Sequence, residues 1–82
     1  MAQRVLVVED SAVIRRLIEV CLRPAALEVI MREDGPQGLE AAINGQPDLL
    51  VLDIGLPEMD GWEVLDRLRS DSRTKDLPVL VL

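Results

Sequence analysis

The chain has almost no aromatic residues, no histidine and one cysteine. Trp62 is the only aromatic residue although 49% of the 82 residues are hydrophobic, so the core must be built from aliphatic side chains. Cys21 has no second cysteine to pair with, which excludes an internal disulfide and fits a reducing cytoplasm. Without histidine, and with one cysteine, the chain lacks the ligands that a zinc site requires.

Long apolar runs and an excess of basic charge are also missing. No apolar run approaches the roughly 20 residues that span a membrane, and the N-terminus has no signal-peptide pattern. We therefore expect a cytoplasmic protein that does not contact a membrane. The net charge of −6 argues against direct nucleic-acid binding, which needs a basic surface. A cluster of acids suits a hard cation with oxygen ligands instead.

Two uninterrupted apolar runs predict buried strands. One is Arg4–Val8, which is followed by Glu9 and Asp10, and the other is residues 48–53, which ends on Asp53. Such runs of Val and Leu are typical of strands that are covered on both faces of a parallel sheet. Ligands of open α/β sheets bind at the C-terminal edge of the strands, so we expect Asp53 to carry the chemistry.

Helices and two further strands are expected around these runs. Residues 13–22 have apolar side chains at helical spacing, with Ser11 as a cap and Pro24 as the end of the helix. We expect an edge strand at residues 27–31, helices at residues 36–44 and 62–69, and a fourth strand at residues 78–82. This alternation predicts one α/β domain with right-handed crossovers and a parallel sheet. Cys21 is expected in the core, and Trp62 is expected to be partly buried.

Three carboxylates are expected to meet at one edge of this sheet. If the first and third strands are neighbours, their ends stand about 5 Å apart, so Glu9, Asp10 and Asp53 share a small volume. Their repulsion calls for a proton or a cation, and Mg²⁺ prefers such oxygen ligands. A carboxylate beside Mg²⁺ can attack phosphorus and form an acyl phosphate. Glu9 and Asp10 also suit a helix N-terminus, while Glu58 and Asp60 are expected to be loop acids rather than ligands.

These motifs resemble the receiver domain of two-component response regulators. The resemblance rests on the acidic pair Glu9-Asp10, on Asp53 at the end of a strand, and on the loop Leu56-Pro57-Glu58-Met59-Asp60-Gly61. It follows the whole chain in order and spacing, including Glu33-Asp34-Gly35 and Leu77-Pro78-Val79. It implies a flavodoxin-like (CheY-like) three-layer fold with the strands in the order 2-1-3-4.

The resemblance also implies a function. Asp53 would accept a phosphoryl group from a sensor histidine kinase or a phosphotransfer protein, so the domain would be regulatory rather than an enzyme. Mg²⁺ would be held by Asp10, by Glu9 through water, by Asp53 and by the backbone carbonyl of Gly55, in a loop shaped by Pro57 and Gly61. The first helix of the family helps to dock the kinase, so Arg15 and Arg16 are either a solvated face or part of that docking surface.

The chain departs from the family pattern after its fourth strand. Receiver domains continue with a Ser or Thr, a helix, a fifth strand that ends in Lys, and a last helix, and Lys75 does not match that Lys position. We therefore expect a partial receiver domain over residues 1–82, with an incomplete fold, an exposed apolar edge strand and an apolar patch. Both features predict a homodimer or other self-association through the fourth strand.

Two other functions follow from the residues. The chain could be a self-associating interaction module that is not phosphorylated. A hydrolase with an aspartyl nucleophile, like the haloacid dehalogenase group, would need a second Asp where Gly55 stands, so we rank it below the other two. A flavin site is disfavoured because Glu9 and Asp10 would repel a phosphate in the absence of a metal.

Overall fold

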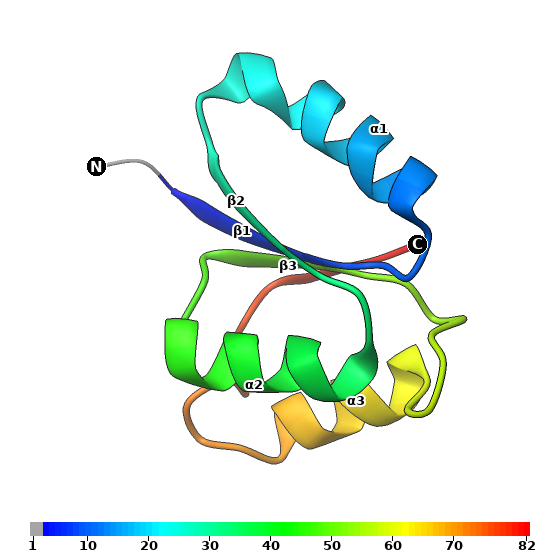
Figure 1. Cartoon of the computed structure of the whole chain (residues 1–82). Coiled ribbons are helices and arrows are strands. Elements are labelled where there is room, and N and C mark those ends of the chain that lie inside the picture. The colour runs from blue at the N-terminus through cyan, green and yellow to red at the C-terminus, as the bar shows by residue number, and fades with distance from the viewer. Residues whose placement is uncertain (1–2) are drawn as a thin grey trace.

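A computed structural model of the chain describes residues 3–82, which form a parallel sheet between helices (Figure 1). The sheet order is β2-β1-β3-β4, with the bounds β1 (Arg4–Val8), β2 (Glu28–Arg32), β3 (Leu49–Leu52) and β4 (Val79–Val81). Helix α1 (Ala12–Leu22) lies on one face of the sheet, and α2 (Gly35–Gly45) and α3 (Gly61–Arg69) lie on the other. The predicted three-layer α/β fold and its strand order are confirmed.

The helices begin where side chains can cap them. The side chains of Ser11, Asp34 and Asp60 accept hydrogen bonds from backbone N–H groups in the first turns of α1, α2 and α3 respectively. Helix α1 ends at Leu22 and is followed by a 3₁₀ turn (Arg23–Ala25) that contains Pro24, as the sequence predicted. Within residues 3–82, no helix has the length and apolar character needed to cross a membrane.

Strand β1 divides the core into two parts because its side chains alternate between the faces of the sheet. Leu6 and Val8 point to the α2 and α3 side and join the larger cluster of buried residues. Val5 and Val7 point to the α1 side, where they pack with Val51. The backbone of β1 is bonded to β2 on one edge and to β3 on the other, so the residues that follow β1 are anchored in the centre of the fold.

Helix α1 is more exposed than its sequence predicts. Ile18 and Leu22 pack against the sheet, whereas Val13 is 70% exposed and Leu17 is 56% exposed. Cys21 is also exposed, so its predicted core position was wrong. Within residues 3–82, α1 is the only α-helix on its face of the sheet (Figure 1), and its apolar side chains are only partly covered. Exposed apolar side chains therefore lie on this side of the sheet, and the apolar patch stays a prediction.

Trp62 is exposed as well, contrary to the expectation that it would be partly buried. Helix α3 faces the core through Gly61, Val64 and Leu68, which are spaced three or four residues apart. Trp62 lies next to Gly61 and so falls outside this stripe, where 60% of it is exposed. The position of Trp62 on the helix, beside the buried stripe, decides the outcome.

Gly38 of α2 is required for the helix to approach β1. A Cβ atom at Gly38 would lie 2.6 Å from Cγ2 of Val8, which is fully buried. We expect Gly38→Ala to destabilise the fold by about 1–3 kcal/mol, as for other overpacked cores. Gly45→Ala is the matched control, because the added Cβ would lie at an ordinary 3.5 Å from Arg4. Urea unfolding of both variants tests this, and equal midpoints would contradict it.

Candidate functional site

The junction of β1 and β3 brings the predicted acids together. Val8 and Leu52 are partners in the parallel register, so Glu9 and Asp53 leave the sheet side by side. The backbone hydrogen bonds of the sheet continue one residue past the strands. The N–H of Asp53 donates to the carbonyl of Val8 at 3.0 Å. The N–H of Glu9 donates to the carbonyl of Arg32, also at 3.0 Å. The buried strands β1 and β3 therefore fix the backbone positions of Glu9 and Asp53.

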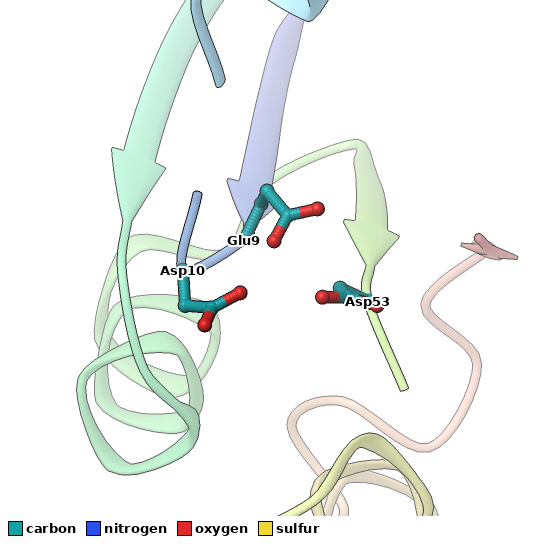
Figure 2. A group of neighbouring side chains, drawn as sticks. All are labelled: Glu9, Asp10 and Asp53. Carbon is teal, nitrogen blue, oxygen red and sulfur yellow. The ribbon is translucent and has the colours of Figure 1, made fainter. Parts of the chain in front are cut away.

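Glu9, Asp10 and Asp53 form one cluster of carboxylates (Figure 2). Each residue offers one oxygen atom, and these atoms all lie within 4.8 Å of one another. Glu9 is buried, Asp53 is half-buried and Asp10 is exposed, so the cluster opens to solvent on the side of Asp10. The predicted convergence of these three side chains is what the structure shows.

The surroundings of Glu9 oppose the ionisation of its carboxyl group. Glu9 is only 6% exposed, and this burial is the main reason why the pKa of its carboxyl is raised above the ordinary value of 4.5. The neighbouring Asp53 and Asp10 raise the pKa further, whereas a hydrogen bond from the N–H of Ser11 to Oε2 of Glu9, at 3.2 Å, lowers it. Without a cation, ionisation of Glu9 is thus opposed by both burial and repulsion.

The turn after β1 shows which residue caps α1. The hydroxyl of Ser11 accepts a hydrogen bond from the N–H of Ile14, so Ser11 is the cap rather than Asp10. Arg15 reaches back from the first turn of α1 and donates to the carbonyl of Glu9 at 2.7 Å. The sequence indicated no such contact, and Arg15 was expected on a solvated or docking face. Helical side chains lean toward the N-terminus, and this is the signal that could have revealed the contact.

The loop after β3 contacts the cluster through its backbone. The N–H of Gly55 donates to Oδ1 of Asp53 at 3.1 Å. Gly61 closes the loop by donating to the carbonyl of Ile54, and a Cβ there would lie 2.6 Å from the carbonyl oxygen of Asp53. The predicted part of Gly61 in shaping this loop agrees with these contacts.

The two other acids of this loop do not join the cluster. Asp60 caps α3 by accepting a hydrogen bond from the N–H of Glu63 at 2.9 Å. Glu58 adopts a left-handed conformation, with φ of 67°, and is exposed. Neither residue belongs to the group of potential ligands found within residues 3–82.

The chemistry of the cluster fits a small hard cation. All of its side-chain donors are carboxylate oxygens, and the side of Asp10 is open to water, which suits a Mg²⁺ ion that keeps several water ligands. A cation would also relieve the repulsion that raises the pKa of Glu9.

Comparison with known proteins identifies the family. The family model of the response regulator receiver domain matches residues 5–82. The chain belongs to the receiver domain family. A curated relative of this receiver domain is the DNA-binding dual master transcriptional regulator RpaA from Synechocystis sp., with 43% identity over 79 residues. That alignment covers 96% of this chain and 33% of RpaA, so the chain spans about a third of this relative's length.

Two solved receiver domains share the fold. The N-terminal domain of a response regulator receiver protein from Methanoculleus marisnigri is 40% identical, has a TM-score of 0.90, and is matched over 95% of this chain and 63% of its own. The receiver domain of the sensor histidine kinase PA1611 from Pseudomonas aeruginosa is 28% identical, has a TM-score of 0.94, and is matched over 99% of this chain and 66% of its own. In the PA1611 domain a magnesium ion is coordinated in the active site cleft.

The raised pKa of Glu9 predicts a pH-dependent stability. Between the ordinary pKa of 4.5 and the higher value in the fold, the folded protein binds more protons at Glu9 than the unfolded chain does. The contribution of Glu9 to stability therefore falls as the pH rises through this interval. We expect Glu9→Gln to be more stable than the wild type at pH 7, and this gain to disappear below pH 4.5.

This expectation is measured by urea unfolding from acid to neutral pH in the presence of a chelator. Glu40→Gln is the matched control, because Glu40 is an exposed glutamate on α2. A gain in stability that is the same at every pH, or the same in both variants, would contradict the prediction.

Proposed function

We propose that this chain is a phosphoacceptor module in which Asp53 takes a phosphoryl group from a phosphohistidine of a sensor histidine kinase or phosphotransfer protein. The observation that carries the proposal is the convergence of Glu9, Asp10 and Asp53 within 4.8 Å at the edge of a receiver-domain sheet. An oxygen of Asp53 would attack phosphorus, a P–O bond would form as the P–N bond breaks, and the imidazole would leave with a proton from solvent.

The proposed cofactor is Mg²⁺, held by Asp10, Asp53 and the carbonyl of Gly55, with Glu9 acting through water. The ion would supply positive charge to the phosphoryl oxygens. Support comes from the all-oxygen donor set of this cluster and from the magnesium ion in the cleft of the PA1611 domain. Receiver domains are regulatory phosphoacceptors rather than enzymes in general, and we propose the same for this chain, working in the cytoplasm.

The chain's own residues would prepare Asp53 for transfer. The N–H of Gly55 holds Oδ1 of Asp53 at 3.1 Å, and the other oxygen would face the donor. Gly61 keeps the loop close behind the carbonyl of Asp53, because a Cβ atom at this position would lie only 2.6 Å from that oxygen. Backbone groups of the loop would thus help to orient the nucleophile.

Phosphorylation of Asp53 has a direct test. With Mg²⁺ and acetyl phosphate, we expect the intact mass of the chain to increase by one phosphoryl group, and we expect no increase for Asp53→Asn or in the presence of a chelator. Asp66→Asn, which alters an exposed acid of α3, should be modified like the wild type. An unmodified wild type, measured beside a complete receiver domain that is modified, would contradict the proposal.

The exposed apolar surface favours a second role as an assembly module. Leu80 is 56% exposed on β4, and Val13 and Leu17 are exposed on α1. Within residues 3–82, β4 pairs with β3 on one edge and has no strand on its other edge. Such an edge is a template for pairing with another strand. The relatives and solved receiver domains give no support for pairing through β4, so self-association stays a prediction from the exposed surface.

We expect the mass of the 82-residue chain in sedimentation equilibrium to rise with concentration across the micromolar range. Leu80→Lys should reduce this association because it places a charge on the exposed strand. Trp62→Lys is the matched control, because Trp62 is similarly exposed, at 60%, but belongs to α3 on the other face of the sheet. A wild type that stays monomeric at every concentration would contradict the prediction.

A further inference from the structure

We infer that Arg15 positions the turn that carries Glu9 and Asp10 and thereby sets the affinity of the acidic cluster for a divalent cation. The inference rests on the proposed function for the identity of the cation, Mg²⁺. The observation that supports it is a contact of the Arg15 guanidinium group with the backbone carbonyl of Glu9.

Arg15 links three separate segments. From the first turn of α1, its Nη1 donates to the carbonyl of Glu9 at 2.7 Å, in the turn after β1. Its Nη2 lies 3.9 Å from Oε2 of Glu33, in the turn after β2. The Arg15 side chain is 20% exposed, so the contact is partly shielded from water, whereas its neighbour Arg16 is exposed. A solvated helix face does not hold an arginine in this way.

The carbonyl that Arg15 binds belongs to the peptide between Glu9 and Asp10. The N–H of Glu9 is already bonded to the carbonyl of Arg32, so the two contacts hold Glu9 at both of its backbone groups. A planar peptide transmits the orientation of its carbonyl to the next Cα atom. Arg15 therefore controls the direction in which the Asp10 side chain leaves the turn, although it is not itself placed to bind the cation.

A positioning role and a simple charge role predict opposite results. A positive charge close to three carboxylates repels a metal cation, so if charge alone mattered, removing Arg15 would tighten cation binding. If Arg15 positions the turn, removing it lets the Glu9–Asp10 peptide rotate, and binding weakens. A hydrogen bond from a charged donor contributes more than a neutral one, and partial exposure reduces that amount, so we expect a loss of affinity of about fivefold.

The variants are Arg15→Met, Arg15→Lys and the matched control Arg16→Met. Calorimetric titration with MgCl₂ should show about fivefold weaker binding for Arg15→Met. Arg15→Lys should recover most of the affinity, because an ammonium group can also donate to the carbonyl of Glu9. Arg16→Met should bind like the wild type, since Arg16 is exposed and acts electrostatically on Glu19. Affinity that is unchanged or tighter in Arg15→Met would overturn the inference.

Two further readouts separate positioning from a general loss of stability. With acetyl phosphate, Arg15→Met should need more Mg²⁺ for half-maximal phosphorylation while keeping its rate at saturating Mg²⁺. In the metal-free protein, the amide signals of Asp10 and Ser11 in ¹H–¹⁵N spectra should move in Arg15→Met and stay in place in Arg16→Met. A fall in both the maximal rate and the urea midpoint with unmoved amide signals would assign Arg15 a structural role only and overturn the inference.

The same experiments distinguish this inference from the proposed function. A wild type that binds Mg²⁺, together with an Arg15→Met variant of equal affinity, removes the inference and leaves the proposed function intact. A wild type that binds Mg²⁺ but gains no phosphoryl group overturns the proposed function, and the calorimetric comparison still decides the inference. A wild type that binds no Mg²⁺ overturns both.

Discussion

The crowding of three carboxylates at the end of two buried strands is the constraint on which the rest of the structure depends. Strands β1 and β3 are held in register by backbone hydrogen bonds and by fully buried aliphatic side chains such as Val8 and Leu52. The backbones of Glu9 and Asp53, which follow these strands, cannot separate without breaking this register. The fold therefore holds together an arrangement whose own electrostatics are unfavourable: burial first, and then the neighbouring Asp53 and Asp10, raise the pKa of Glu9.

Much of this arrangement could be predicted from the sequence because it depends on strong local patterns. Apolar runs without polar interruption fixed the central strands, and the acids at their ends fixed the edge of the sheet where Glu9 and Asp53 meet. The alternation of elements then allowed few topologies. These signals come from the residue types and from their spacing along the chain, so they do not depend on knowing the tertiary contacts.

The predictions failed where tertiary contacts decide the burial or the partners of a side chain. Helical periodicity showed that α1 has an apolar side, but not how much of it the sheet would cover, and Cys21 proved exposed for that reason. Trp62 was expected to be partly buried, although it lies beside the buried stripe of α3 rather than in it. Arg15 was assigned to a solvated or docking face because the pattern of a helix does not show which backbone carbonyl a long side chain can reach.

The two sides of the acidic cluster are held by different means. On the side of Asp53, close backbone approaches fix the loop: Gly61 packs against the carbonyl of Asp53, and a Cβ at Gly35 would lie 2.5 Å from the carbonyl oxygen of Met59. Glycine allows these approaches because it has no side chain, so this half has little freedom to adjust. On the side of Asp10, the turn depends on the long side chain of Arg15, which can change its rotamer. In the proposed function a fixed Asp53 would face an adjustable Asp10, and the affinity for the cation would be tuned on the Asp10 side without disturbing Asp53.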